Sequence, residues 1–313
     1  MQIINSLNDI KTEERTAIAL GNFDGIHVGH RAILEDAIRI AAERGLKSVC
    51  YTFSNHPFNY IMNRDENDPD GIKLICTEEQ KIRMLEEMGF DILVNVPFDG
   101  QMMTMRAMDF IEDVLVNGLN AAAVCVGFNY SFGARAEGKS EMLIREGLKH
   151  DIDVRVHDAV AVDGKVVSST LIRKTIAEGD MEKVALYLGR DYAFEGIVQT
   201  GRRIGSTIGF PTANLPAPVN RALPCDGVYF GRIELRGESR RCIINMGCNP
   251  TVSDGSIKTI ETHIFDYDGG DCYGEKIAVY FEHFHRPEMQ FADKEELHRQ
   301  IASDCEEAKA FRV

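Results

Sequence analysis

The hydrophobic residues of the first 188 positions fall into short apolar runs separated by longer segments with helical spacing. The runs predict strands, and the spaced segments predict helices that each bury one face. The expected strands are residues 17–20, 48–53, 92–96, 122–127 and 154–156. The expected helices include one after the first strand and residues 77–89, 103–117 and 140–150. Strands separated by helices favour parallel pairing, so this half is predicted to be a doubly wound parallel sheet.

The pattern changes after a short predicted helix, residues 180–188, which ends before Gly189. Extended segments then follow one another with glycine and proline between them: residues 194–200, 228–235, 241–245, 259–265 and 277–284. Closely spaced strands of this kind predict a small antiparallel β-barrel. A charged amphipathic helix, about residues 294–311, ends the chain. We therefore expect two domains, residues 1–186 and 187–313.

Residues 21–30, Gly-Asn-Phe-Asp-Gly-Ile-His-Val-Gly-His, lie between the first predicted strand and the first predicted helix. A glycine-rich turn that enters a helix is a common site for phosphate, because N–H groups and the helix dipole favour an anion there. His27 and His30 are three residues apart, so on a helix they face the same way. Two imidazoles beside such a turn can stabilise charge on a phosphoryl group. The alternative is that both only cap a surface turn.

A second candidate phosphate site is the stretch of residues 168–173, Ser-Ser-Thr-Leu-Ile-Arg. Hydroxyl side chains before an apolar helix are good N-caps, which explains the serines without any ligand. Arg173 adds a guanidinium to the same helix start. Hydroxyls, backbone N–H groups and a guanidinium together suit a triphosphate tail, so Ser169, Thr170 and Arg173 are predicted phosphate ligands.

The barrel half contains two further candidates. Thr212 and Asn214 are alternate residues of the Gly/Pro-rich stretch 205–214, and their oxygens are suitable ligands for Mg²⁺, which usually also binds substrate phosphate oxygens. Glu261 shares a strand face with His263, opposite an apolar face, and could accept a proton from a substrate hydroxyl. The alternatives are a Gly/Pro turn with satisfied polar groups and an ordinary edge carboxylate.

Charge and cysteine content exclude several classes of protein. The net charge of −14 argues against binding a nucleic acid backbone. The eight cysteines form no Cys-x-x-Cys pair, which is typical of reduced thiols in a cytoplasmic protein. No signal peptide or membrane span is apparent, so no membrane partner is expected.

The ordered motifs resemble one family over almost the whole chain, the bacterial bifunctional riboflavin kinase/FAD synthetases. The resemblance begins with residues 21–30, which are similar to that family's adenylyltransferase signature. The other matching segments are residues 52–57, 127–133, 168–173, 209–214, 245–251 and 261–263. Two positions depart from the family's pattern: Asn55 replaces a common proline, and the loop 134–139 is less basic than usual.

The resemblance implies a Rossmann-like nucleotidylyltransferase domain that makes FAD from FMN and ATP, and a barrel that phosphorylates riboflavin. In the first domain it implies that His27 and His30 are catalytic. It also implies that ATP and phosphate are held by Gly21, Phe23, Gly29, Ser169, Thr170 and Arg173. In the barrel, Glu261 would be the base, and Gly209, Thr212 and Asn214 would hold Mg²⁺-ATP. His56, Asn129 and Arg286 would contact the flavin.

Two other functions are consistent with parts of the sequence. One is a single-activity FMN adenylyltransferase whose barrel only binds flavin as a regulatory module; intact Thr212, Asn214 and Glu261 argue against it. The other is an RNA-modifying or tRNA-charging protein, since His-x-Gly-His also occurs in those classes; the acidic charge argues against it. The oligomeric state, including a homo-oligomer, is left open.

Overall fold

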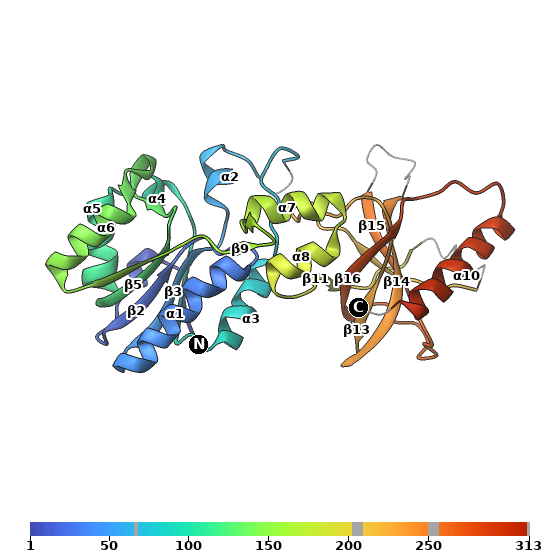
Figure 1. Cartoon of the computed structure of the whole chain (residues 1–313), viewed down its shortest axis with the longest axis horizontal. Helices are drawn as coiled ribbons and strands as arrows, with labels where there is room; N and C mark the ends of the chain where they lie inside the picture. Colours follow the sequence, from blue (N-terminus) through green and yellow to red (C-terminus); the bar gives the residue numbers. More distant parts are fainter. Residues whose placement is uncertain (66–67, 202–208, 250–256, 312–313) are drawn as a thin grey trace. The chain divides into compact units, whose positions relative to one another are not determined.

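The computed structural model describes residues 1–65, 68–201, 209–249 and 257–311. Parts of two motifs quoted above, residues 205–208 and 250–251, lie outside these ranges. The chain divides into two compact units, Met1–Ser169 and Thr170–Val313. Each unit has its own sheet (Figure 1).

The first unit is built on a six-stranded parallel sheet, as the alternation of strands and helices predicted. Its strand order is β1-β4-β3-β2-β5-β8. The strands are β1 (Gln2–Ile4), β2 (Thr16–Leu20), β3 (Lys47–Phe53), β4 (Ile92–Val96), β5 (Ala121–Gly127) and β8 (Asp153–His157). β2, β4 and β5 are almost wholly buried, which explains why they are apolar apart from Thr16 and Asn95.

Helices cover both faces of this sheet (Figure 1). On one face lie α1 (Val28–Arg44) and α3 (Glu78–Met88). On the other lie α4 (Gly100–Thr104), α5 (Ala107–Asp109), the π-helix η2 (Phe110–Gly118) and α6 (Ser140–Gly147). Shorter elements are η1 (Leu7–Asp9), α2 (Pro57–Ile61), β6 (Ser131–Phe132), η3 (Ala134–Ala136), β7 (Gly138–Lys139), η4 (Leu148–His150), β9 (Ala161–Val162) and β10 (Lys165–Val166).

The prediction of a single helix over residues 103–117 is wrong, because the helix is interrupted after α4. Met105 is extended, and its carbonyl accepts a hydrogen bond from the backbone N–H of Ala134 (2.7 Å). Helix α5 then restarts at Ala107, whose N–H donates to the Glu137 carboxylate (2.8 Å). A distant loop thus supplies the partners at the break, which hydrophobic spacing alone does not reveal.

The second unit begins at Thr170, the second residue of α7 (Ser169–Glu178), and α8 (Met181–Leu188) comes next. Six antiparallel strands follow in the order β11-β16-β13-β14-β15-β12. They are β11 (Tyr192–Ile197), β12 (Ala213–Pro216), β13 (Gly227–Leu235), β14 (Glu238–Asn249), β15 (Ile257–Ile264) and β16 (Lys276–Arg286). An isolated bridge between Gln199 and Asn214 links the two ends of the sheet into a nearly closed barrel.

Alternation along the barrel strands separates two apolar layers. Tyr229, Ile244 and Thr262 are fully buried and oppose one another across β13, β14 and β15. The neighbouring residues Phe230 and Ile243 face the other side, where helix α10 (Lys294–Ala310) packs through Cys305 and Ala308. This terminal helix was predicted, whereas the short strand β12 was not.

Two candidate active sites

The turn of residues 21–30 holds a strained backbone in a buried setting. Phe23 (φ 49°) and Ile26 (φ 38°) adopt left-handed conformations that are rare for such side chains, and both are buried. The Asp24 carboxylate accepts hydrogen bonds from the backbone N–H groups of Ile75 (2.9 Å) and Cys76 (3.4 Å). Neighbouring residues therefore hold the turn in this conformation. Backbone strain of this kind is commonly retained at functional sites.

The two histidines of this turn lie together at the start of α1. Their rings are stacked, with centroids 3.6 Å apart, and His30 also meets the edge of Phe23. His27 is the N-cap of the helix, because its Nδ1 accepts from the His30 backbone N–H (3.2 Å). A Cβ on Gly29 would approach the His27 ring to 3.2 Å, so a glycine lets this ring lie over the helix start. The predicted common face is confirmed, and capping accompanies it.

The histidines lie at the point where the direction of the sheet's connections reverses. From β2 the chain proceeds through β3 to β4, whereas β5 and β8 lie on the other side of β2. Ligands in open α/β sheets bind at the carboxyl ends of the strands beside such a switch point. Asn129 is exposed in the turn after β5, the strand next to β2, so it lies at the same sheet edge as His27.

Ser169 links the second phosphate motif to this turn. Its Oγ donates to the Asp24 carbonyl (3.2 Å), which joins the first residue of α7 to the histidine turn. Gly21 lies on the other side of the turn, where a Cβ would meet the Phe23 ring at 2.8 Å. Thr170 and Arg173 follow along α7 in the second unit, and their phosphate roles stay predictions.

On the predicted flavin side, His56 is the N-cap of α2 and accepts from the Phe58 N–H (3.2 Å). Asn55, the departure noted above, exchanges two hydrogen bonds with the backbone of Phe98 (2.7 and 3.0 Å) and ties the ends of β3 and β4 together. Lys81 has no role that its sequence context predicts. Its ammonium group is buried and donates to the Phe53 carbonyl (2.6 Å) at the end of β3.

In the barrel, the two predicted Mg²⁺ ligands are in contact. The Asn214 amide Nδ2 donates to the Thr212 hydroxyl (3.3 Å) and to its carbonyl (3.2 Å). A Cβ on Gly201 would lie 2.6 Å from the Asn214 amide carbon, so a glycine makes room for this side chain. Gly209, also predicted to contact ATP, has a left-handed φ of 87° just before this segment. The hydroxyl and amide oxygens of the pair fit a hard divalent ion.

Strand register brings the predicted base to the same place. Glu261 on β15 directly opposes Asn214 on β12 and, on its other side, Asn245 on β14. Directly opposed residues share one face of a sheet. The neighbouring residues Ile260 and Thr262 are fully buried on the opposite face, as the alternation predicted. Asn245, which had no assigned role, therefore completes a polar row with Glu261 and Asn214.

An open cavity of about 1070 Å³ adjoins this row. Its lining includes Gly209, Thr212, the strand end at His263, and Cys305 and Lys309 of α10. The His263 imidazole contacts the Pro211 carbonyl (2.9 Å), and burial lowers its pKa below the usual value. The volume is close to the upper end of the range of small-molecule sites.

Arg286, predicted to contact flavin, is bound to the buried carboxylate of Asp304. Its guanidinium donates to both carboxylate oxygens, the shortest contact being 2.6 Å. Burial opposes ionisation of Asp304, but hydrogen bonds from Arg286 and Gln300 outweigh it and hold its pKa below the ordinary value. These contacts anchor α10 to β16, and the flavin contact of Arg286 stays a prediction.

Comparison with known proteins assigns both halves of the chain. The family model of FAD synthetase matches residues 9–171, and that of riboflavin kinase matches residues 188–312. The bifunctional riboflavin kinase/FMN adenylyltransferase of Listeria monocytogenes is 33% identical, covering 99% of this chain and 98% of that protein. The protein of the same name from Escherichia coli K12 is 32% identical, with the same coverage of both chains.

A crystal structure from Streptococcus pneumoniae, described as a macrolide-efflux protein, has 29% identity and a TM-score of 0.90, covering 99% of both chains.

Among the residues described in the present structure, no helix is long and apolar enough to cross a membrane. Two family models in series and relatives aligned from end to end establish the family. The chain belongs to the bifunctional riboflavin kinase/FMN adenylyltransferases, which phosphorylate riboflavin to FMN and then adenylylate FMN to FAD.

Proposed function

We propose that the two reactions are carried out by separate groups of residues, one centred on His27 and His30 and the other on Asn214 and Glu261. Adenylylation of FMN is assigned to the turn with His27 and His30, and phosphorylation of riboflavin to the barrel row with Asn214 and Glu261. The observation that supports this assignment is that the histidine pair and the Asn214–Glu261 pair belong to different compact units with separate sheets. A regulatory barrel without activity is not favoured, because the predicted kinase residues converge.

In adenylylation, an oxygen of the FMN phosphate attacks the α-phosphorus of ATP, and the bond to pyrophosphate breaks. His27 and His30 would donate hydrogen bonds to the negative charge that develops, and the start of α1 would add its dipole. Ser169, Thr170 and Arg173 would bind ATP phosphates. No covalent enzyme intermediate is needed, so positioning and electrostatics supply the catalysis.

On the same sheet edge, the glycines at 21 and 29 would allow the backbone to approach ATP, and Phe23 would shape the floor of the turn. His56 and Asn129 would contact FMN from the ends of β3 and β5. Lys81 would position the β3 end from which His56 follows, through its bond to the Phe53 carbonyl.

In riboflavin phosphorylation, the terminal ribityl hydroxyl attacks the γ-phosphorus of ATP, and ADP leaves. Glu261 would accept the hydroxyl proton as the bond forms. Thr212 and Asn214 would hold Mg²⁺, which neutralises charge on the ATP phosphates when bound. Gly209 lets the chain turn beside that pair, and the cavity between β15 and α10 would hold a substrate.

Two variants of the full chain test the division of labour. His30→Ala should slow FAD formation from FMN by roughly a hundredfold to a thousandfold and leave FMN formation from riboflavin unchanged. Glu261→Gln should slow riboflavin phosphorylation about a hundredfold and leave adenylylation of supplied FMN intact. Both products are measured by separating riboflavin, FMN and FAD after incubation with Mg²⁺-ATP. Equal loss of both activities in either variant would refute the assignment.

The cell compartment is also part of the proposal. The cysteines that the structure describes are all free thiols, and most are buried. Free thiols in this number are typical of a reducing compartment, which supports the cytoplasm.

A further inference from the structure

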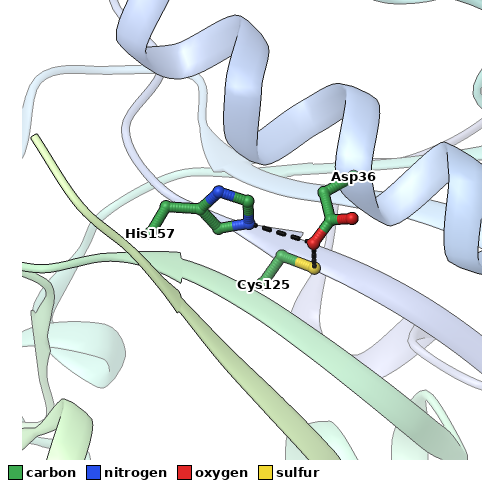
Figure 2. A group of neighbouring side chains, drawn as sticks. All are labelled: Asp36, Cys125 and His157. Atoms are coloured by element: carbon green, nitrogen blue, oxygen red, sulfur yellow. Dashed lines mark hydrogen bonds and ion pairs between the residues drawn. The ribbon is translucent and has the colours of Figure 1, made fainter. Parts of the chain in front are cut away.

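Three chemically distinct side chains meet under helix α1, away from the residues assigned above. Asp36 extends from the middle of α1, Cys125 from β5, and His157 is the last residue of β8 (Figure 2). The Asp36 Oδ2 lies 3.1 Å from His157 Nε2 and 3.7 Å from Cys125 Sγ. All three ligand atoms lie within 4.8 Å of one another.

The two separations from Asp36 Oδ2 are close to those expected around a single tetrahedral ion. Zn²⁺ binds sulfur at about 2.3 Å and nitrogen or oxygen at about 2.0–2.2 Å, which separates its ligand atoms by roughly 3.3–3.6 Å. The two distances from Asp36 Oδ2 differ from that range by only a few tenths of an ångström, and the sulfur and the imidazole nitrogen lie within 4.8 Å of each other. Thiolate and imidazole select zinc-like ions over Mg²⁺, which prefers oxygen ligands.

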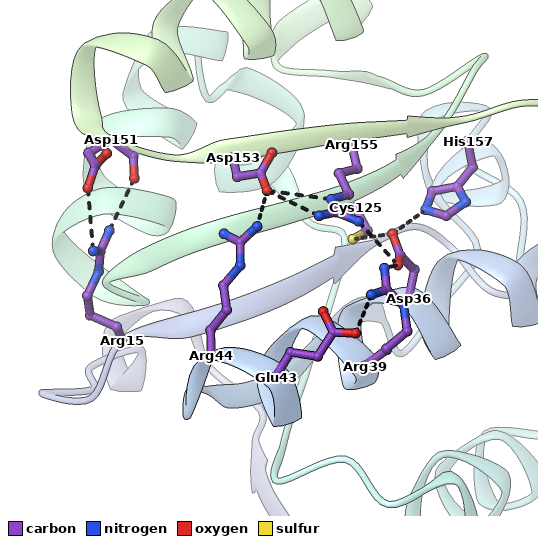
Figure 3. A network of polar contacts seen from close by, with 10 residues as sticks. All are labelled: Arg15, Asp36, Arg39, Glu43, Arg44, Cys125, Asp151, Asp153, Arg155 and His157. Carbon is purple, nitrogen blue, oxygen red and sulfur yellow. Dashed lines mark hydrogen bonds and ion pairs between the residues drawn. The ribbon is translucent and has the colours of Figure 1, made fainter.

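The carboxylate is held with one oxygen toward the sulfur and the imidazole. Its other oxygen, Oδ1, accepts a hydrogen bond from Arg39 and pairs with Arg155 at 3.7 Å (Figure 3). Burial opposes ionisation of Asp36, but Arg39, Arg155 and His157 outweigh it and hold its pKa below the usual value. Outer partners of this kind orient the carboxylate ligands of metal sites.

The two guanidinium charges are balanced by further carboxylates. Arg39 also pairs with Glu43 (2.6 Å), and Arg155 pairs with Asp153 (3.5 Å).

The Cys125 side chain is fully buried, and burial together with Asp36 raises the pKa of its thiol to about 12.

We propose that Asp36, Cys125 and His157 bind one Zn²⁺ or similar thiolate-preferring divalent ion, with water as the fourth ligand. Binding forms a Zn–S bond and releases the Cys125 proton to solvent, so affinity rises with pH. The ion joins α1 to β5 and β8. His27 lies at the start of α1, and Asn129 follows β5. The ion therefore stabilises the framework of the adenylylation site without contacting the substrate.

The full-length protein, freed of metal with a chelator, tests the proposal directly. Titration with Co²⁺ should give one equivalent of a complex with tetrahedral visible bands and a thiolate-to-cobalt charge-transfer band, and Zn²⁺ should displace it. Zn²⁺ should also raise the temperature of unfolding, whereas the same concentration of Mg²⁺ should not. A wild-type protein that shows no thiolate charge-transfer band would overturn the proposal, whatever the variants do.

Variants then identify the ligands. Cys125→Ala and His157→Gln should each weaken Zn²⁺ binding by about a hundredfold or more, beyond the usual cost of losing an outer partner. Cys50→Ala is the matched control, because Cys50 is a buried thiol in the same core layer under α1 but lies outside the cluster. Equal Zn²⁺ affinity in Cys125→Ala and Cys50→Ala would place the ion elsewhere and refute the assignment.

Discussion

Helix α8 should decide whether the barrel folds on its own. Two fragments test this, residues 170–313 and residues 187–313. Met181 and Val184 are fully buried, and their helix packs against β11 and β16. Glu182 adds a contact to His283 of β16 (2.5 Å). The longer fragment keeps these contacts. The shorter one begins at the domain boundary expected from the sequence and loses them, although it contains every predicted kinase residue.

The expected loss is large. Burying one side chain of this size contributes about 1.5–3 kcal/mol, so Met181 and Val184 together contribute about 3–6 kcal/mol. A typical domain is stable by only about 5–15 kcal/mol. We therefore expect residues 170–313 to fold and phosphorylate riboflavin, and residues 187–313 to be largely unfolded or to melt at a much lower temperature.

Circular dichroism during heating and a riboflavin kinase assay on both fragments measure the difference. The longer fragment with Met181→Ala and Val184→Ala is the control, since it keeps the chain length but removes the buried groups; its stability should approach that of the short fragment. The reasoning would be refuted if residues 187–313 unfolded at the same temperature as residues 170–313 and were equally active.

Three further changes have definite expected outcomes. Asp304→Ala should cost about 3–5 kcal/mol of unfolding free energy, because it leaves the Arg286 charge in a mostly buried position without its partner. The pKa of Asp304 is held below its usual 3.8, so its contribution to stability is present above pH 3.8 and is lost as the pH falls through the lower pKa of the folded state. The unfolding free energies of wild type and variant, measured with denaturant, should therefore converge at that low pH. Lys81→Met should raise the KM for FMN about tenfold in adenylylation without changing riboflavin phosphorylation, and an unchanged KM would argue against its positioning role. Gly201→Ala should lower kinase activity about tenfold or more, because its Cβ would meet the Asn214 amide at 2.6 Å, while adenylylation assayed with FMN should persist.

Local patterns predicted much of this fold because they depend on neighbours in sequence. Thr77 and Gln80 form a complete capping box, and Gly89 ends the same helix with a left-handed φ of 92°. Strand β12 was missed because it has only four residues, ends in a proline and is fixed by pairing with β15 some fifty residues later. Hydrophobic spacing carries no information about such a partner.

The candidate sites divide along the same line. His27 and His30 could be placed on one face from their spacing, since both lie at the start of one helix. Asn245 opposes Glu261 because of the register between β14 and β15. Asp36, Cys125 and His157 lie together because of the order of β2, β5 and β8 in the sheet. Neither is encoded in a short motif.

The pairing of β12 with β15 makes kinase activity a test of correct folding. A shift of one residue would place Ala213 or Leu215 opposite Glu261 and turn the Asn214 amide into the barrel interior. Such a molecule could keep most of its hydrogen bonds and its compactness, yet it would have no amide oxygen beside the base. Specific activity per folded molecule would then count the correctly paired population, which spectroscopic measures of strand content do not distinguish.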